Sequence, residues 1–292
     1  MTTRGRPPGS LRPTTPTDPT LTTRPVPRTR TYTPQSYGPG AAPNIRDLVR
    51  NPEHVRAESD PATYLNSMDA QYSHILQDGI YRLLKEVAEY ETVFDGNDEM
   101  LGVDPTWGVY AFVVDYDPDT LRKIPAAIHN LIQVTRRNIR AQSTSAYTDE
   151  ALRRFKIDVV QDEEALSGAS DHRIREEFRA HLRGLQQLGD DGVIRGAVRN
   201  YACLVLNQPV VCMLVGLTFP EDLREDWRLF RENTIKLVDA WWERPVTNVS
   251  AYRGVDCCPI TSLAYFYREV STGANNGAMQ DLWPLKKPPS GF

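Results

Sequence analysis

Two stretches in the middle of the chain have the spacing of apolar residues that β-strands require. From Trp107 to Tyr116 nearly every residue is apolar, and most are aromatic or β-branched, which is typical of a strand buried on both faces. From Phe155 to Asp162 apolar and polar residues alternate, as expected of a strand buried mainly on one face. We therefore expect two strands here, at the centre of the fold.

A turn and a capped helix follow the second strand. The acidic triplet at residues 162–164 ends the strand, Gly168 and Ala169 supply a turn, and Ser170 is placed to cap the next helix. Beyond Ser170, apolar residues recur every three or four positions while arginines lie off that line, so one side of the helix is apolar. This apolar side consists of Ile174, Phe178, Leu182 and Leu185.

Helical spacing also marks the segments on either side of the first strand. Residues 59–100 contain a long apolar stripe, which predicts one helix or two with a break near Gly79. After the first strand, Asp117 and Pro118 open another helix, with Pro125 kinking it or marking its first turn. The remaining predicted elements are a strand at Tyr201–Leu206 and a terminal helix at Pro259–Val270 that begins at its proline.

Two later segments are ambiguous from their residues alone. Val210–Leu217 has the composition of the return arm of a hairpin, but a short apolar run of this kind is equally compatible with a short helix. Asn233–Trp242 is likewise compatible with a last strand or with a helix. Both alternatives stay open at this point.

The order of these elements predicts an α+β fold. Two strands joined by a helix imply a right-handed crossover, and a third strand inserted between them gives an antiparallel sheet with helices on one face. We therefore expect a ferredoxin-like sandwich, an antiparallel sheet backed by helices and preceded by a long helix. A doubly wound parallel sheet is the alternative, disfavoured because no glycine-rich phosphate loop follows the first strand. The predicted division is a disordered tail (1–58) and a single domain (59–292), made of a helical segment (59–100), a sheet core (105–242) and a C-terminal helix and tail (243–292).

The first 40 residues differ sharply in composition from the rest. They hold nine Pro and eleven Thr without apolar periodicity, so they cannot bury enough surface to offset the entropy of ordering. They also hold six Arg and one acidic residue, a net +5, which leaves −9 on the other 252 residues because the whole chain carries −4. The Thr-Pro steps at Thr15 and Thr33 could serve a groove-binding domain or a kinase, although a solvated tail is the simpler interpretation.

Charge and cysteine usage exclude several classes of protein. An acidic body argues against nucleic-acid binding, which needs clustered Lys and Arg on the folded surface. No run of about 18 apolar residues and no apolar signal-peptide core occur, which predicts an intracellular protein, cytoplasmic or nuclear, with no membrane contact. The four cysteines lack CxxC spacing, so reduced thiols are expected.

Four segments of the chain resemble a family of uncharacterised proteins of filamentous ascomycete fungi. The segments are WGVYAFVVDYD, FKIDVVQDEEALSGASDHRIREEFRAHL, YACLVLNQ and IKLVDAWW, between Trp107 and Tyr267. They are similar to the family's aromatic-Gly strand, its D…LDGAS…VR…F turn and helix, its CLVDE strand and its VKLVDAW strand. The chain departs from the pattern at Ser167, where the family has Asp, and at Asn207-Gln208, where it has Asp-Glu. The resemblance implies a helix at Gln208–Val215 and a fourth strand at Thr234–Asp239, and it implies no activity.

Acidic residues gather where the two central strands end. If these strands are parallel, once removed from each other, their carboxyl ends share one edge of the sheet. Converging carboxylates can bind Mg²⁺ or Ca²⁺ or act as an acid/base pair. The structural alternative is that Asp117 caps a helix, that Asp119 favours its dipole and that the triplet is a solvated turn. The candidate metal ligands are Asp115, Asp117, Asp162, Glu163 and Glu164.

Other reactive side chains in the sequence lack a catalytic spacing. Ser170 and His172 are two apart at a helix start, so their side chains point away from each other. Vicinal Cys257 and Cys258 lack the gapped spacing of a zinc site. We therefore expect a non-catalytic interaction or accessory protein that meets a protein partner through its N-terminal tail. The alternative is a small-molecule-binding protein or enzyme of fungal secondary metabolism that uses the acidic edge. No cofactor is predicted, and a divalent metal at that edge is the one candidate.

Overall fold

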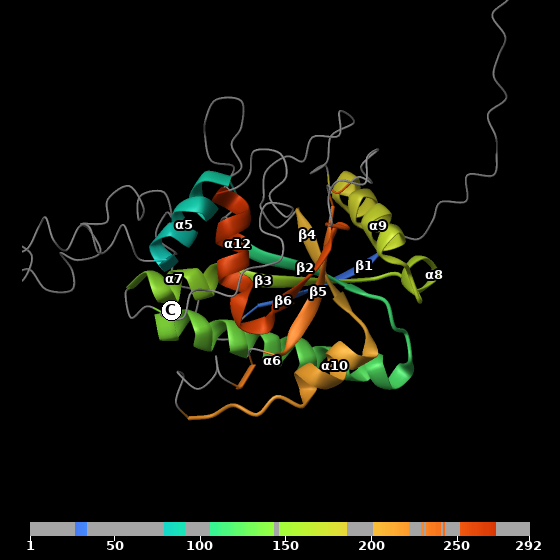
Figure 1. The fold of residues 1–292 in the computed structure, drawn as a ribbon, viewed down its shortest axis with the longest axis horizontal. Helices are drawn as coiled ribbons and strands as arrows, with labels where there is room; N and C mark the ends of the chain where they lie inside the picture. The colour runs from blue at the N-terminus through green and yellow to red at the C-terminus, as the bar shows by residue number, and fades with distance from the viewer. Residues whose placement is uncertain are drawn as a thin grey trace, which may run out of the picture.

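A six-stranded mixed sheet forms the centre of the molecule, with strand order β1-β3-β2-β4-β5-β6 (Figure 1). The computed structural model describes residues 27–33, 79–90, 106–142, 146–185, 201–221, 229–230, 232–240, 242 and 252–272. The strands are β1 (Arg28–Tyr32), β2 (Trp107–Val113), β3 (Phe155–Gln161), β4 (Ala202–Leu206), β5 (Thr234–Asp239) and β6 (Val255–Pro259). The helices are α5 (Gly79–Tyr90), α6 (Pro118–Gln142), α7 (Ala146–Arg154), α8 (Glu163–Leu166), α9 (Asp171–Gly184), α10 (Gln208–Val215), η2 (Ile260–Ser262) and α12 (Leu263–Thr272).

Strand β2 is the middle of a parallel core. It pairs in parallel with β3 on one side and with β4 on the other, whereas β1, β5 and β6 join as antiparallel strands. The chain therefore moves from β2 to β3 in one direction and then returns past β2 to reach β4. The strand order reverses at β2, and the carboxyl ends of β2, β3 and β4 lie along one edge of the sheet.

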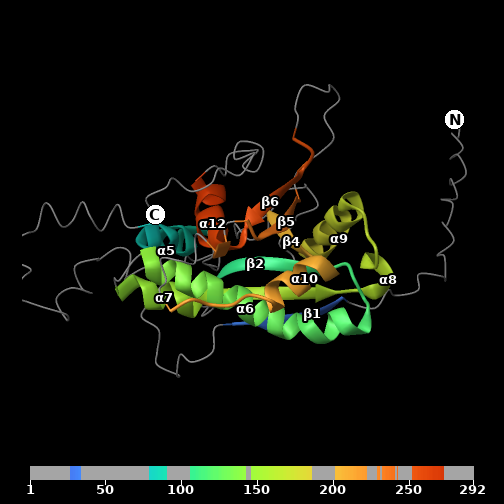
Figure 2. The same ribbon diagram turned by 60° about the horizontal axis from the view of Figure 1, so that its bottom comes forward.

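Helices cover both faces of the sheet (Figure 2). Alternate side chains of β2 enter two separate cores: Val109 and Val113 pack in the core that includes α6 and α10, while Tyr110 and Phe112 pack in the core that includes α8 and α9. The period of two along β2 explains this division, because neighbouring residues of a strand point to opposite faces. The fold is thus a three-layer arrangement of helices, sheet and helices.

Three further helices pack around the start of β2. The Trp107 indole donates a hydrogen bond to the carbonyl of Ala151 in α7 at 2.7 Å, and its ring lies edge-on to Tyr267 of α12 at 5.6 Å between centroids. Helix α5 joins them through Tyr81, whose ring meets Tyr147 of α7 at 5.3 Å. Figure 1 shows α5, α7 and α12 side by side at this end of the sheet. At the opposite end, where β2, β3 and β4 finish, the chain enters α6, α8 and α10 respectively.

The expected ferredoxin-like antiparallel sheet with helices on one face is wrong. A right-handed crossover from β2 to β3 and a second one from β3 back to β4 run in opposite directions across the sheet, so their helices must lie on opposite faces. Strands β2 and β3 are also direct neighbours instead of being once removed. The coarser prediction, a fold that combines one sheet with helices packed against it, is confirmed.

Most predicted elements are confirmed where the structure describes them. Both central strands and the helix from Pro118 are present, the segment at Gln208–Val215 is the helix α10, and Thr234–Asp239 is the strand β5. The terminal helix begins later than expected, because Pro259 ends the unpredicted strand β6 and α12 starts at Leu263.

The N-terminal expectations are covered only in part. Residues 28–32, inside the segment expected to be disordered, form β1 and pair with β3, so that expectation does not hold for these five residues. Residues 79–90 form α5, as the helical stripe predicted. The remainder of both segments, 1–26, 34–78 and 91–100, lies outside the described residues.

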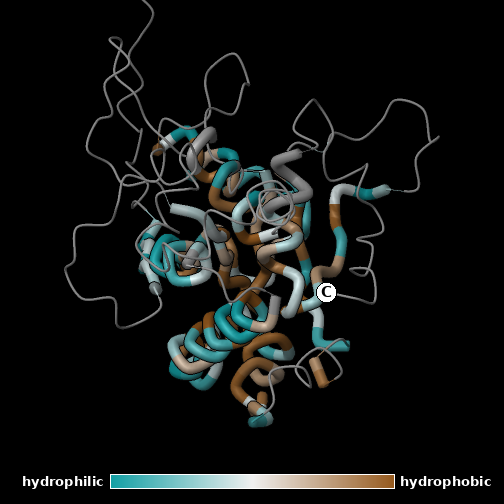
Figure 3. The backbone as a smooth tube through the Cα atoms, turned by 90° about the vertical axis from the view of Figure 1, so that its left-hand side faces the viewer, coloured by the Kyte–Doolittle hydropathy of each residue, from teal (hydrophilic) through white to brown (hydrophobic). Residues whose placement is uncertain are grey.

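The helices carry one buried and one exposed side. Along the tube in Figure 3 hydrophobic and hydrophilic residues alternate within the helical coils, as expected when one side faces the sheet. In α6, for example, Ile124, Ile128 and Leu131 are fully buried while Pro125 is exposed. Among the described residues, none of the helices combines the length and apolar character needed to cross a bilayer.

Candidate functional site

The side chain of Tyr116 connects the carboxyl ends of β2 and β3. The backbone amide of Asp162 donates a hydrogen bond to the Tyr116 hydroxyl at 2.7 Å. Burial raises the pKa of Tyr116 to about 12, and the nearby charges of Asp162 and Glu163 add to that rise against the lowering effect of the backbone hydrogen bond. The phenol therefore remains protonated at neutral pH and lies among carboxylates at the edge of the sheet.

Backbone contacts bind the same edge together. The Val114 amide donates to the carbonyl of Leu206 at 3.0 Å, which extends the pairing of β2 and β4 by one residue. The amide of Gly168, in the turn after α8, donates to the carbonyl of Val114 at 2.9 Å. Gly168 has φ of 62°, a conformation that glycine adopts without steric cost. The turn thus lies directly on the end of β2.

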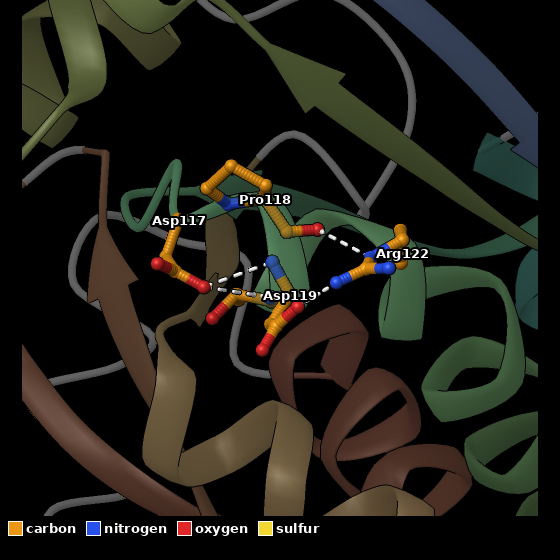
Figure 4. A network of polar contacts seen from close by, with 5 residues as sticks. Asp117, Pro118, Asp119 and Arg122 are labelled. Carbon is orange, nitrogen blue, oxygen red and sulfur yellow. Dashed lines mark hydrogen bonds and ion pairs between the residues drawn. The ribbon is translucent and has the colours of Figure 1, made fainter.

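Two of the five candidate carboxylates fold the loop between β2 and α6. Asp115 Oδ1 accepts from the amide of Asp117 at 3.0 Å, and Asp117 Oδ1 accepts from the amides of Asp119 at 2.8 Å and Thr120 at 3.4 Å. Figure 4 shows Asp117 at the start of the helix, with Arg122 bonded to Asp119 and to the carbonyl of Pro118. Asp117 is therefore the N-cap of α6, as the structural alternative proposed.

The other three carboxylates form the acidic turn after β3. Asp162 caps α8 by accepting from the amide of Ala165 at 3.1 Å, and Glu163 and Glu164 are exposed in the first turn of that helix. Parallel pairing of β2 with β3 places this triplet at the same edge as Asp115 and Asp117. Within the described part of the chain, no three His, Cys, Asp or Glu side chains are grouped so that they could hold one ion. The metal site stays a prediction.

A buried hydroxyl that the sequence analysis missed lies in the first turn of α6. Thr120 is 2% exposed, and its Oγ1 has no hydrogen-bond partner among the described residues. One turn further along the helix, Ile124 packs in the core on the same side. Buried polar atoms are hydrogen-bonded in the great majority of cases, so a buried hydroxyl without a partner among the described residues is an exception, which a bound water or ligand would satisfy. No sequence signal could have identified it, because threonine is common near helix starts.

Helix α10 brings a third helix start to this edge. Asn207, the residue after β4, caps α10 by accepting from the amide of Val210 at 3.1 Å. Asn130 of α6 donates to the carbonyl of Leu214 near the end of α10 at 2.9 Å, so the two helices on this face are connected by a hydrogen bond. Asn207 therefore serves as the N-cap of α10.

Ser170 and His172 have the structural roles expected of them. Ser170 Oγ accepts from the amide of Arg173 at 3.3 Å at the start of α9. His172 is exposed and lies 3.5 Å from Glu176 one turn along the same helix. The two side chains therefore serve the helix and not a nucleophile–base pair.

A second polar cluster lies where β5 ends, at the edge of the sheet opposite to the carboxyl ends of β2, β3 and β4. The Arg175 side chain of α9 is 5% exposed; it donates to the carbonyl of Asp239 at 2.7 Å and to that of Gly254 at 3.0 Å, and it lies over the Trp242 ring at 4.8 Å. The Tyr252 hydroxyl donates to Asp239 Oδ2 at 3.0 Å. Burial lowers the pKa of Arg175 and raises that of Tyr252. The guanidinium joins the end of β5 to the start of β6, which is a structural role.

The four cysteines are free thiols. Cys203 and Cys258 are buried, and burial raises the pKa of both thiols, which keeps them protonated and unreactive at neutral pH. Cys212 and Cys257 are exposed on α10 and β6.

Comparisons with known proteins give no relative for this chain. No family model matches the sequence, no curated protein matches it, and no solved structure matches its fold.

Proposed function

We propose that the protein binds a small polar molecule at the edge of the sheet where β2, β3 and β4 end. Open sheets with parallel strands bind ligands outside the carboxyl ends of the strands, at the point where the strand order reverses, and here that point is β2. The observation that carries the proposal is the buried Thr120 hydroxyl, in the helix turn that follows this strand, which has no hydrogen-bond partner among the described residues. This supports the small-molecule alternative over a purely structural edge.

The charges at the edge define the class of ligand. Asp115, Asp117 and Asp162 present carboxylates there, and these accept hydrogen bonds from hydroxyl or ammonium groups. A phosphate or carboxylate ligand would be repelled, since two like charges 4 Å apart cost about 4 kcal/mol at an effective dielectric constant of 20. The protein therefore suits a neutral polyol or a cationic amine, held at its inner end by the Thr120 hydroxyl and flanked by the protonated Tyr116.

A divalent ion is the alternative occupant of this edge, in place of a cationic ligand. Mg²⁺ and Ca²⁺ take carboxylate oxygens as ligands, and the candidates are Asp115, Asp117 and Asp162, with Glu163 and Glu164 beside them. The hydrogen bonds that Asp115 accepts in the loop and Asp117 accepts at the start of α6 each use Oδ1. Isothermal titration with MgCl₂ and CaCl₂, compared between the native chain and the D115N and D162N variants, tests the metal. If both variants bind the metal with the affinity of the native chain, the metal does not bind at this edge.

Paired threonine variants test the ligand site itself. T120V removes the orphan hydroxyl, whereas T135V removes a hydroxyl of the same helix that is equally buried but bonded to the carbonyl of Leu131 at 3.0 Å. We would titrate adenosine, glucose and spermidine into both variants and into the native chain. At least one probe should bind the native chain and T135V alike and bind T120V about tenfold more weakly, the effect of one lost hydrogen bond. Equal affinity in T120V, or no binding of any probe at millimolar concentration, would contradict the proposal.

An interaction or accessory protein without catalysis is the second candidate. It is supported by strand β1, which carries the exposed Arg28 and Arg30 of the basic N-terminal segment on the rim of an acidic body. A partner of this surface would be acidic. Fluorescence anisotropy with a labelled polyglutamate peptide tests this, and the R28E/R30E double variant should lose binding if the basic strand carries it.

The resemblance to the ascomycete family suggests a fungal source for the chain. Four free cysteines are typical of the reducing cytoplasm or nucleus, which supports an intracellular location. Fractionation of expressing cells, with detection of the chain in the cytosolic, nuclear and secreted fractions, tests the location directly.

A further inference from the structure

The turn η2 and the start of α12 lie inside the protein. The five consecutive residues 260–264 are each at most 5% exposed. Leu263 has helical dihedral angles, with φ of −60° and ψ of −42°, so η2 leads into α12 without a break. The first turn of this helix is therefore packed against the core and is not in contact with solvent.

Two hydroxyl groups at this helix start lack a hydrogen-bond partner. Thr261 is 3% exposed and Ser262 is 4% exposed, and neither Thr261 Oγ1 nor Ser262 Oγ bonds to any residue that the structure describes. A buried hydroxyl without a partner costs free energy, and buried polar atoms are bonded in the great majority of cases. Two such hydroxyls on adjacent residues indicate that a bound species completes their hydrogen bonds.

The backbone at the same place contributes further donors. The first amides of a helix have no acceptor within the helix, and a side-chain cap commonly supplies one. Here the cap position is Pro259, and the turn has no side-chain cap hydrogen bond. The amide of Ile260 is bonded, because it donates to the carbonyl of Asn233 at 3.0 Å. The aligned peptide dipoles also give the start of α12 a partial positive charge, which favours an anion.

The neighbouring elements place little negative charge against this turn. Helix α6 packs on η2, and α6 has no acidic residue after Asp119 in its first turn, whereas arginine and lysine recur along it. In β6, Asp256 accepts from the amide of Cys257 at 2.8 Å, and Glu232, the residue before Asn233, is exposed. The surroundings therefore favour an anion, in contrast to the acidic edge of the sheet.

We propose that η2 and the start of α12 form a buried binding site for a monovalent anion, with chloride as its occupant. The Thr261 and Ser262 hydroxyls donate to the ion, and the positive end of the helix dipole stabilises it. A divalent anion such as sulfate would lose far more hydration and would need a paired cation, and in the described part of the chain no cationic side chain is bonded to either hydroxyl. This site is separate from the ligand site at Thr120, and neither depends on the other.

Crystals of the full-length chain soaked in sodium bromide locate the site, because bromide replaces chloride and is identified by its anomalous scattering. In solution, the line width of the chlorine NMR signal measures chloride affinity. The variants T261V and S262A each remove one hydroxyl, whereas T261S keeps it. The matched control is T135V, which removes an equally buried hydroxyl that is bonded to the carbonyl of Leu131 at 3.0 Å.

Bromide should lie within hydrogen-bond distance of Thr261 Oγ1 and Ser262 Oγ. T261V and S262A should each bind chloride about tenfold more weakly than the native chain, the effect of one lost hydrogen bond, while T261S and T135V bind it as the native chain does. The proposal is overturned if a water molecule alone occupies the site in the bromide-soaked crystal. It is also overturned if the native chain does not broaden the chlorine signal, or if T261V and S262A broaden it as much as T135V does.

Discussion

The Tyr116 hydroxyl accepts a hydrogen bond from the backbone amide of Asp162, so the side chain of a residue just after β2 is bonded to the backbone just after β3. These two positions are separated by helices α6 and α7 in the sequence. The contact fixes the two carboxyl ends side by side, and the proposed ligand site is built on that pair.

Loss of the Tyr116 hydroxyl should make the stability of the protein less sensitive to alkaline pH. The folded pKa of about 12 lies above the 10.0 of an unfolded tyrosine, so the folded state holds the phenol proton more tightly between these values. Stability from this group is present below pH 10 and is lost as the pH rises to about 12. Urea unfolding of the native chain from pH 9 to about 12 should show this decline.

The Y116F variant isolates that contribution. It should be less stable at pH 7 by about 1 kcal/mol, because the amide of Asp162 loses its acceptor. The difference between the native chain and Y116F should shrink as the pH approaches 12. A constant difference across that range would contradict the assigned pKa.

Two glycines with similar backbone conformations should respond differently to a methyl group. Gly254 has φ of 73° and a Cβ there would lie 2.5 Å from Cγ of Trp242, whereas at Gly168, with φ of 62°, nothing lies within 4 Å. G168A should therefore cost about 1 kcal/mol for backbone strain alone, and G254A about 3 kcal/mol because the clash adds to the strain. Thermal or urea unfolding measures both, and equal losses would show that the chain near Gly254 moves aside.

The buried ion pair of helix α7 should be far more sensitive to mutation than an exposed one. Glu150 bonds to Arg154 at 2.5 Å, and both side chains are at most 5% exposed. E150Q removes the charge that balances a buried guanidinium and should cost about 3 kcal/mol. R122Q, in the exposed pair with Asp119, should cost less than about 0.5 kcal/mol. Similar values for the two variants in urea unfolding would disprove the difference in burial.

The orphan hydroxyl should also leave a mark on stability in the absence of ligand. Burying a hydroxyl without a partner costs about 1 kcal/mol or more, so T120V should leave the free energy of unfolding unchanged or raise it by about that amount. T135V should lower it by about 1 kcal/mol, since the bond to Leu131 is lost. A clear loss of stability in T120V would mean that the hydroxyl has a partner in the folded protein.

The spacing of apolar residues predicted the individual strands and helices well, because that spacing depends on which side of each strand or helix is buried. Strand β2 is a continuous apolar run, β3 and α9 have apolar residues at the correct period, and the caps at Ser170 and Asp117 were readable from residue type. Layer assignment failed for a different reason. The sequence around Phe155 does not record whether β3 lies next to β2 or one strand away, and that spacing decides the faces on which the helices pack.

The missed strands lie at the rim of the sheet. Strand β1 is exposed at four of its five residues, and β6 combines Asp256, two cysteines and a proline, so neither has an apolar alternation to detect. The same limit applies to the candidate site. The carboxylates were predictable because they follow strands directly. The Thr120 hydroxyl is distinguished only by having no partner in the part of the chain that the structure describes, which is a property of packing.

The attachment of two distant carbonyls to one guanidinium bears on how the molecule can be engineered. Arg175 fixes Asp239 and Gly254 independently of the chain that joins them. Because lengthening a connection adds only a small entropic cost, the spacing between these two carbonyls should survive a change in the length of the chain between them. Length variants of the β5–β6 connection therefore offer a way to engineer the protein without moving β5 relative to β6.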